Sequence, residues 1–513
     1  MTEIPVRETF WNIPAWAVAG VYVGGAIAVA VFAWGLYRRI RVWRRGGPEM
    51  RGDRIPERIV KVIREVLFQA RILSQPYPGI MHAAMFWGFL ALFTGTAIAT
   101  VDWEVTRLLF DFRVLEGPFY LLFELTLDLF GLFLLVGLGL ALWRRFVKRP
   151  KRIEPSGKFA YALLVLFVLA LTGFLIEGAR LAVTQPPWGP WSPVGWGVGQ
   201  ALLAAGMGEG ALRGLHFSLW LAHALIVFGF IALIPRSYFV HLVATPLNIF
   251  FSRLPPRGAL AKIENLEEQE TFGISKFEQF SWKRRLDFDA CVECGRCHDI
   301  CCAQQTGGVL SPKRVMVKLK RYMLDGDTRP LHGDVISPEE LWSCTTCAAC
   351  ARECPAHLDI VDTIVDLRRY LALSEGALPS TAPRYLMGLG RPEDLMAGVA
   401  LGVDLFDCVV PTRHARHGML FTSQGVLAIR NARFAGDGAP PDPACDCPTC
   451  RHHERGYLRH LFQVGDALGP RLATLHNLRF YLGLMERARH AISAGGFAAL
   501  REQVERSARA RVA

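Results

Sequence analysis

Five long apolar stretches constrain the fold of this 513-residue chain more than any other feature. Each holds roughly 20 nearly uncharged residues, the length that an α-helix needs to cross the hydrocarbon core of a bilayer. They are Ala15–Tyr37, Ile80–Thr100, Phe119–Trp143, Phe159–Ala182 and Phe217–Tyr238. Buried helices of a large soluble core would carry interleaved charges, so the pattern favours five transmembrane helices. The first stretch is too long for a cleavable signal peptide and ends in arginines, so we expect it to be retained.

The charges between these stretches predict an orientation. The loops after the first and third stretches are rich in Arg and Lys, whereas the other two loops hold few. Loops rich in Arg and Lys stay in the cytoplasm, which predicts an N-terminus outside the inner (plasma) membrane. Everything after the fifth helix would then be cytoplasmic. Much of the net charge of +12 is thereby explained without binding to nucleic acid.

The 13 cysteines all lie between Cys291 and Cys450. Two runs share the spacing C-x2-C-x2-C-x3-C, one from Cys291 to Cys301 and one from Cys344 to Cys354. Such clustering favours metal ligation over disulfide bonds. With this spacing a tight loop wraps three thiolates around one iron–sulfur cube, and the fourth thiolate starts a helix and reaches the other cube.

We therefore expect two [4Fe–4S] clusters. Their ligands would be Cys291, Cys294, Cys297 and Cys354 for one, and Cys301, Cys344, Cys347 and Cys350 for the other. Two zinc sites are the alternative, but four-cysteine zinc sites typically consist of two separated pairs. Cys302 stands where this motif normally has proline, and we expect a spare thiol there.

The apolar region holds four histidines: His82, His216, His223 and His241. Ionisable groups at membrane depth are costly and functional by default. His82 begins the second helix and His241 ends the fifth on the same side, so the two are suited to clamp one haem iron. His223 precedes His241 by roughly 27 Å along a helix. It therefore lies near the outer face, where no histidine of another helix is available as its partner.

The first part of the chain resembles a known family. The motifs GIMHAAMFWGF and LAHALIVF…HLVATPLNIFF are similar to the membrane domain of the nitrate reductase gamma subunit. Joined to CVECGRC and CTTCAAC, residues 1–375 resemble heterodisulfide-reductase-like iron–sulfur oxidoreductases that exchange electrons with menaquinone. The resemblance implies a haem b between His82 and His241, with a quinone site close by. In two-haem members another histidine follows the first on the second helix, and here that position is Leu92.

An outer haem thus remains an open alternative. His216 or His223 would otherwise serve proton transfer to quinone, or simply form hydrogen bonds within the bundle. Oxidoreductases of this kind usually continue into cysteine-rich modules with a CC pair, and no such pattern follows Cys354. We therefore expect a segment that carries electrons between quinone and a cytoplasmic partner subunit.

The last part of the chain has a different character. We predict a helix over Ile360–Leu373 and a domain boundary in the loop Ser374–Pro383, which is rich in Gly, Pro and Ser. Four residues further on follow the pattern C-x-C-x2-C-x25-H: Cys445, Cys447, Cys450 and His476. A closed set of three cysteines and one histidine is suited to a tetrahedral structural Zn²⁺.

The sequence PRYLMGLGRPEDLMAGVALGVDLFDCVVP, with CDCPTC and TLHNLRFYLGLM, closely resembles the C-terminal part of bacterial tRNA-guanine transglycosylase. That family is a (β/α)8 barrel that exchanges guanine for a queuosine precursor in tRNA. The resemblance implies that Asp407 is the nucleophile that binds tRNA covalently and that Met387 lies near the base pocket. It also implies that Arg413 and Arg416 contact tRNA phosphates. A solvated basic loop is the alternative for the two arginines.

The sequence thus predicts a mixed, multidomain chain. We expect a five-helix transmembrane haem b domain (1–250), an α-helical two-[4Fe–4S] ferredoxin-type domain (251–375) and a partial (β/α)8 barrel with a zinc subdomain (379–513). About six barrel strands, with the general base, should precede Pro383 and are replaced by the iron–sulfur domain. The tail is therefore expected to be inactive. The alternatives are a membrane-tethered enzyme that exchanges guanine in tRNA, and a chimeric reading frame joined near Leu378–Pro379.

Overall fold

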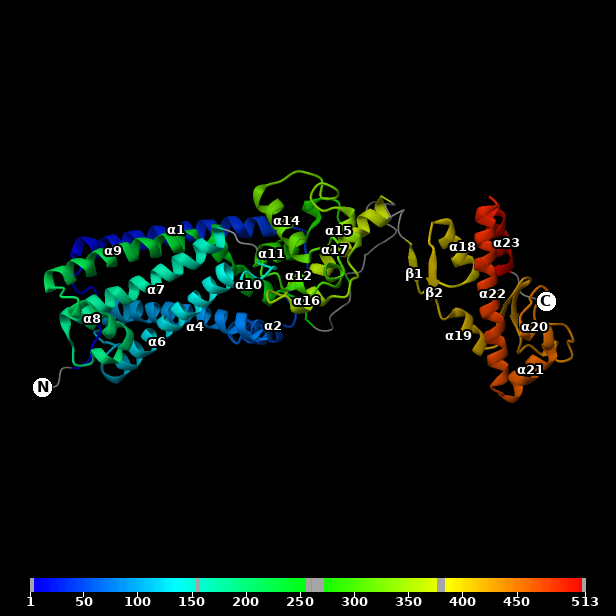
Figure 1. Ribbon diagram of the computed structural model, residues 1–513, viewed down its shortest axis with the longest axis horizontal. Coiled ribbons are helices and arrows are strands. Elements are labelled where there is room, and N and C mark those ends of the chain that lie inside the picture. Colours follow the sequence, from blue (N-terminus) through cyan, green and yellow to red (C-terminus); the bar gives the residue numbers. More distant parts are fainter. Residues whose placement is uncertain (1–3, 154–156, 255–259, 261–271, 376–382, 510–513) are drawn as a thin grey trace. The chain divides into compact units, whose positions relative to one another are not determined.

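Two compact units make up the chain, Met1–Ala377 and Leu378–Ala513 (Figure 1). The computed structural model describes residues 4–153, 157–254, 260, 272–375 and 383–509. The join predicted near Leu378–Pro379 lies outside the described residues, as do residues 376–382 of the predicted boundary loop. Each unit has buried apolar clusters of its own.

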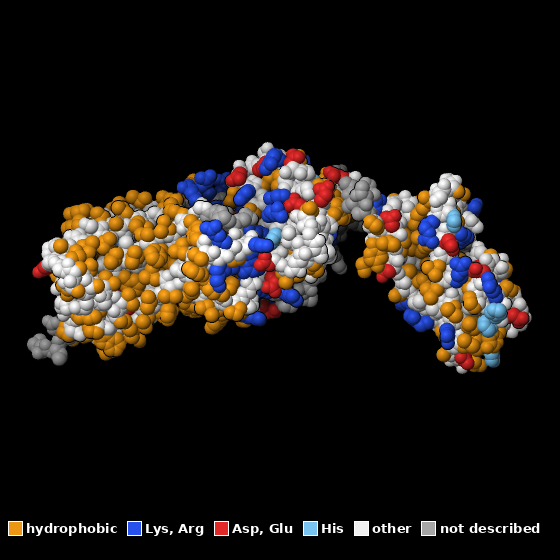
Figure 2. Space-filling view, viewed as in Figure 1, with side chains coloured by type: hydrophobic (Ala, Val, Ile, Leu, Met, Phe, Trp, Pro, Cys, Tyr) orange, Lys and Arg blue, Asp and Glu red, His pale blue; other side chains and the backbone are white. Residues whose placement is uncertain are grey.

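Five long apolar helices form a bundle in the first unit (Figure 1). They are α1 (Ala15–Arg44), α4 (Pro76–Val101), α6 (Gly117–Leu142), α7 (Gly157–Thr184) and α9 (Glu209–Leu233). All five are long and apolar enough to cross a membrane, as the sequence predicts. Hydrophobic side chains cover most of the bundle surface seen in Figure 2. A soluble protein rarely exposes an apolar surface of that extent, so the unit is a membrane protein in character.

Glycines bring α4 and α6 into close contact. A Cβ added at Gly88 would lie 2.7 Å from the carbonyl oxygen of Phe130, and one added at Gly137 would lie 2.9 Å from the backbone nitrogen of Met85. A larger side chain at either position would push the two helices apart. Small residues at helix crossings are typical of bundles in lipid, where van der Waals packing rather than the hydrophobic effect joins the helices.

Short elements connect the long helices. They are α2 (Ile55–Val62), α3 (Ala70–Leu73), α5 (Arg107–Phe110) and α8 (Pro193–Ala204). The second and third long helices also continue as π-helical turns, over Asp102–Thr106 and Trp143–Lys148. α8 packs against α7, where a Cβ added at Gly199 would lie 2.9 Å from the carbonyl oxygen of Gly178.

The fifth helix ends earlier than the sequence predicts. After Leu233 come two short 3-10 turns, Ile234–Arg236 and Tyr238–Val240. Pro235 lies at this break and accounts for it, because proline has no backbone N–H to continue the helical hydrogen bonds. His241 then begins a separate helix, α10 (His241–Phe250). The prediction that His241 ends the fifth helix is therefore wrong, and so is the helical rise calculated from His223.

The rest of the first unit is a helical domain around one buried apolar cluster. Its helices are α11 (Trp282–Ala290), α12 (Arg296–Asp299), α13 (Cys302–Gln305), α14 (Pro312–Asp325), α15 (Pro338–Trp342), α16 (Ala349–Glu353) and α17 (Ile360–Arg369). The helix predicted over Ile360–Leu373 is α17 with a π-helical extension, Tyr370–Ser374.

Arginines join this domain to the bundle. Arg39 of α1 donates to Asp289 over 3.1 Å, and Trp43 of the same helix donates to the other oxygen of Asp289 over 3.0 Å. From the domain, Arg296 donates to the carbonyl oxygens of Arg71 and Ile72, over 2.7 and 2.8 Å. Arg152, in the basic segment after the third long helix, also donates to Asp299 of the domain over 3.0 Å, so both basic segments bind the cysteine-rich domain.

The second unit contains little sheet. Strands β1 (Tyr385–Met387) and β2 (Leu405–Asp407) pair in parallel, and β3 (Met419–Thr422) and β4 (Gly425–Ala428) pair antiparallel. Its helices are α18 (Pro392–Ala400), α19 (Val410–Arg416), α20 (Pro448–His452), α21 (Arg455–Val464), α22 (Leu468–Ser493) and α23 (Phe497–Arg509). Among the described residues a barrel is not confirmed: two parallel strands are too few to close one.

The Asp289 contacts predict a stability change. Asp289→Ala leaves Arg39 and the indole N–H of Trp43 without their buried acceptor. Loss of one partner of a buried ion pair should lower the free energy of unfolding by about 3–5 kcal/mol. Denaturant unfolding of the full chain in detergent measures this. The control is Asp325→Ala at an exposed position, expected to change stability by less than about 0.5 kcal/mol; equal values for both variants would contradict the assignment.

Candidate cofactor sites

The cysteines form two separate groups, each around its own small hollow. One hollow is lined by Cys291, Cys294, Cys297 and Cys354. The other is lined by Cys301, Cys302, Cys344, Cys347 and Cys350. Each predicted quartet takes three cysteines from one sequence run and the fourth from the other run, and Cys302 lines the second hollow as a fifth cysteine. The structure therefore brings together the two quartets that the spacing predicts.

The two loops that carry three cysteines share an unusual backbone. Glu293 and Gly295 have φ values of 55° and 76°, and Thr346 and Ala348 in the other loop have 55° and 58°. These are the third and fifth positions of both motifs. Left-handed conformations are unfavourable for residues with a Cβ and persist where a site imposes them. Such a backbone turns a short loop tightly around its centre.

The fourth cysteines differ in setting. Cys301 precedes the short helix α13, as predicted. Cys354 instead follows the end of α16, and no helix begins before Ile360; the prediction that each fourth thiolate starts a helix is wrong there, since the chain turns through Pro355. The Sγ of Cys302 lies 3.7 Å from that of Cys347 and 3.0 Å from the hydroxyl of Thr345.

Burial and crowding make several of these thiols poor acids, whereas a hydrogen bond with the backbone of Ala349 lowers the pKa of Cys347. Burial, opposed by Lys320, raises the pKa of Cys291 to about 11. Burial and then the neighbouring Cys344 raise the pKa of Cys350 to about 12. Burial and the nearby Cys354, Cys291 and Cys294 raise the pKa of Cys297 as well. Without a metal cation such thiols keep their protons, and iron at the centre of each quartet would replace them.

A cavity of about 270 Å³ lies at the end of the bundle that faces the cysteine-rich domain. Both His82 and His241 line it. Apolar side chains such as Met85, Phe89 and Phe230 form most of its wall. The two histidines come from different helices, α4 and α10. His241 lies on α10 because the chain breaks after α9 and starts a new helix at the cavity.

Both histidines are oriented by hydrogen bonds through Nδ1. The Nδ1 of His82 lies 2.9 Å from Oε1 of Gln69, and that of His241 lies 2.8 Å from the carbonyl oxygen of Tyr238. Since both acceptors are oxygens, both Nδ1 atoms carry the proton and both Nε2 atoms keep a lone pair. This is the arrangement of metal-ligating imidazoles, and it fits a haem iron.

The rim of this cavity is basic and touches one cysteine loop. Arg144, Arg145, Arg152 and Arg296 all line it. Cys294, a member of the first quartet, lines it too, as does Pro355, which follows Cys354 of the same quartet. The cavity thus combines two imidazoles, an apolar wall, cationic groups and contact with a predicted cluster.

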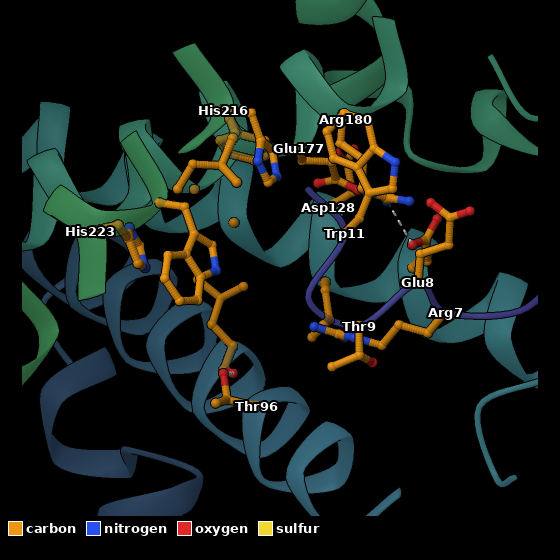
Figure 3. A pocket seen from close by; sticks show the side chains of 18 of the residues that line it. Arg7, Glu8, Thr9, Trp11, Thr96, Asp128, Glu177, Arg180, His216 and His223 are labelled. Atoms are coloured by element: carbon orange, nitrogen blue, oxygen red, sulfur yellow. Dashed lines mark hydrogen bonds and ion pairs between the residues drawn. The ribbon is translucent and has the colours of Figure 1, made fainter. Parts of the chain in front are cut away.

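A second cavity, of about 450 Å³, lies nearer the other end of the bundle (Figure 3). His216 and His223, both on α9, line it, and Figure 3 shows the segment Arg7–Trp11 crossing it. His223 Nδ1 lies 2.8 Å from the hydroxyl of Thr172. His216 is 4% exposed, and its Nδ1 has no hydrogen-bond partner. Leu92 also lines this cavity.

Charged side chains of the long helices surround the second cavity. Glu124 accepts hydrogen bonds from Arg180 over 3.4 Å and from Ser192 over 3.1 Å. Asp128 accepts two from the first backbone N–H groups of α8, over 2.8 and 3.0 Å. Glu177 lies 3.9 Å from Arg180. The sequence-based reasoning missed these residues, although a carboxylate inside an apolar helix is itself a signal of function.

In the second unit, Cys445, Cys447, Cys450 and His476 converge. Their ligand atoms all lie within 4.8 Å of one another. Nε2 of His476 donates to the carbonyl oxygen of Phe421 over 2.8 Å, which leaves Nδ1 toward Cys450, 3.2 Å from its Sγ. This set fits a tetrahedral metal ion.

The residues implied by the transglycosylase resemblance lie at the surface. Asp407 is exposed at the end of β2 and pairs in register with Met387, which is 69% exposed. Arg413 and Arg416 are exposed on α19. A parallel pair is normally covered on both faces, whereas Tyr385 and Leu405 here are more than half exposed.

Two family models match the chain. One, described as a 4Fe-4S dicluster domain, covers residues 287–358. The other, described as queuine tRNA-ribosyltransferase, covers residues 357–510. The chain therefore holds a [4Fe–4S] dicluster domain followed by a transglycosylase segment, as its resemblances predict.

Curated relatives divide in the same way. An EtfAB:quinone oxidoreductase of Syntrophomonas wolfei is 32% identical over 432 residues, 76% of this chain and 59% of the relative. A probable iron-sulfur-binding oxidoreductase FadF of Bacillus subtilis is 29% identical over 71% of this chain and 57% of the relative. A queuine tRNA-ribosyltransferase of Nitrosomonas europaea is 52% identical over 140 residues, 27% of this chain and 38% of the relative. The chain thus spans less than two thirds of each of these relatives.

The quartets predict different effects for substitutions of Cys354 and Cys302. Cys354→Ser should remove about four iron atoms per chain, because it takes one ligand from a cluster. Cys302→Ser should leave the iron content unchanged, since Cys302 belongs to neither predicted quartet. Iron analysis and low-temperature EPR of the anaerobically purified chain measure both. Loss of a cluster in Cys302→Ser would show that Cys302 is a ligand and that the quartets are wrongly assigned.

Proposed function

We propose that this protein carries electrons between a quinone in the membrane and a cytoplasmic redox partner, through two [4Fe–4S] clusters and one haem b. The cavity shared by His82, His241 and Cys294 supports this most directly. It adjoins a cysteine quartet on one side and lies among apolar helices on the other. The relatives named as iron–sulfur and quinone oxidoreductases support the same class of reaction.

The inner cavity is suited to a haem with two histidine ligands. Nε2 of His82 and Nε2 of His241 would bind the iron, while Gln69 and the carbonyl of Tyr238 hold the two rings through Nδ1. The arginines of the rim would bind the propionate carboxylates of the haem. A haem bound in this way supplies one-electron redox chemistry and leaves no open position for substrate.

The two quartets suggest an order for the electron path. The first, with Cys294, reaches the inner cavity, so its cluster would be next to the haem. The second includes the exposed Cys347, flanked by the exposed residues Thr346 and Ala348. The cytoplasmic partner would bind at this surface. The name of the Syntrophomonas relative gives EtfAB and quinone as its reacting pair. In this protein electrons would flow from the cytoplasmic partner to the quinone.

We further propose an inner-membrane location with the N-terminus outside and both cysteine-rich regions in the cytoplasm. The basic segments that bind the dicluster domain, through Arg39 and Arg152, support this orientation. The tail would hold a structural Zn²⁺ at Cys445, Cys447, Cys450 and His476. It would not catalyse base exchange, because it matches only 38% of a complete relative. tRNA binding through Arg413 and Arg416 is the property that such a segment would retain.

The haem assignment predicts a selective loss. His82→Ala and His241→Ala should each abolish the reduced-minus-oxidised absorption of a b-type haem in membranes, because a single histidine leaves the iron weakly held. His216→Asn should keep that absorption, since His216 lies at the other cavity. The [4Fe–4S] EPR signal serves as the folding control in all three variants. An unchanged haem spectrum in His82→Ala would refute the assignment.

We predict that the tail has no base-exchange activity on tRNA. The purified chain should not incorporate labelled guanine into tRNA, whereas a complete queuine tRNA-ribosyltransferase assayed in parallel should. The reason is that a parallel pair of strands provides no closed base pocket. Incorporation that disappears in Asp407→Asn would instead establish a membrane-tethered tRNA-modifying enzyme.

A further inference from the structure

The second cavity has the composition of a redox site that handles protons. Four carboxylates line it (Glu8, Glu124, Asp128 and Glu177) against two guanidinium groups (Arg7 and Arg180). The carboxylates of Glu124 and Asp128 are held by the hydrogen bonds described above. Glu177 lies on α7 within the bundle, 3.9 Å from Arg180, a longer contact than those that hold Glu124 and Asp128, which suits it to gain and lose a proton.

The two cavities are adjacent along two helices. On α4, Phe89 lines the inner cavity and Leu92 lines the second; on α7, Leu166 lines the inner cavity and Leu169 the second. Three residues correspond to a rise of about 4.5 Å. Less than one helical turn therefore separates their walls, and an electron that reaches the inner cavity has a short path to the second.

Two features point away from a second haem. His216 and His223 are seven residues apart on one helix, two turns along the same face, so they cannot bind an iron from opposite sides. Leu92 lines the cavity from α4 but has no ligand atom. The buried Nδ1 of His216, which has no partner, is instead available for a hydrogen bond to a bound polar molecule.

Building on the proposed function, we propose that the second cavity binds the quinone headgroup, with His216 bonding a headgroup oxygen and Glu177 transferring protons. The headgroup takes up two electrons from the inner cavity and two protons by way of Glu177, so that both carbonyl oxygens become hydroxyls. The reductant is the cytoplasmic partner, acting through the iron centres. Thr96 lines the cavity and is exposed on the apolar bundle surface, which gives the isoprenoid tail an exit into lipid.

This site also determines where the protons come from. The segment Arg7–Trp11 crosses the cavity, and the bridge from Val6 to Glu116 holds that segment against the start of α6. Glu8 is exposed on this segment. Protons would therefore enter past Glu8 from the side of the N-terminus rather than from the side of the dicluster domain.

The test measures binding of the fluorescent quinol analogue 2-heptyl-4-hydroxyquinoline N-oxide to membranes that contain the full chain. Gly173→Leu places a side chain in the cavity beside His223, where a Cβ has 4.0 Å of room. We expect this variant to weaken analogue binding by at least about tenfold and to retain the haem spectrum. Gly20→Leu, at an exposed position of α1 with no atom nearby, is the matched control and should bind like the wild type.

A second variant separates proton transfer from binding. Glu177→Gln keeps the size of the side chain, so analogue affinity should change less than about threefold, while quinone reduction slows and its pH dependence changes. Glu209→Gln, an exposed carboxylate outside the cavity, should alter neither. If Gly173→Leu also loses the haem spectrum, the comparison of Glu177→Gln with Glu209→Gln tests the proposed quinone site instead.

Three results would overturn the inference. They are wild-type binding in Gly173→Leu with the haem intact, an unchanged rate and pH profile in Glu177→Gln, and two haems per wild-type chain. Failure of the proposed function has a different signature, the absence of any b-type haem in the wild type. Because analogue binding is read by fluorescence, it can be scored in either case.

Discussion

Eight thiols gathered around two small hollows are the constraint on which the rest of this structure depends. Each predicted quartet takes three cysteines from one loop and one from the other sequence run, so neither quartet forms unless both segments fold together. Burial and mutual repulsion oppose ionisation of thiols such as Cys297 and Cys354. Left-handed residues at equivalent positions of both loops hold the backbone tightly around each centre. Positive metal centres are what make this arrangement favourable.

The same domain is attached to one end of the bundle by ion pairs and hydrogen bonds. Arg39 and Trp43 share the carboxylate of Asp289, two residues before the first cysteine. Arg71 donates to the carbonyl oxygen of Cys354 over 3.0 Å, at the other end of the same quartet. The first cluster would thus be held on the inner cavity from two directions. Electron transfer requires a short, fixed distance between redox centres, and these ion pairs and backbone hydrogen bonds would maintain it between the proposed haem and the first cluster.

The sequence predicts those features that follow from length and spacing. Hydrophobic length alone locates the five helices, and cysteine spacing alone predicts which thiols come together. Features that depend on a break in a helix or on packing cannot be predicted in this way. Pro235 separates His241 from the fifth helix, and nothing local in the sequence pairs His82 with Gln69 or places His241 at the same cavity. The carboxylates Glu124, Asp128 and Glu177 were visible in the sequence as charges within apolar helices. Their meeting around one cavity required the bundle geometry. In the tail, the motif predicts the convergence of Cys445 and His476, whereas the predicted barrel is reduced to two parallel strands among the described residues.

The central claim is that two iron–sulfur clusters lie directly beneath a bundle that continues their electron path. The most direct measurement is iron and acid-labile sulfide analysis of the anaerobically purified full chain, combined with EPR after reduction. We expect about eight sulfide ions and about nine iron atoms per chain, and a spectrum of two interacting reduced [4Fe–4S] clusters. A colourless protein with zinc in place of iron at those eight cysteines would contradict the account.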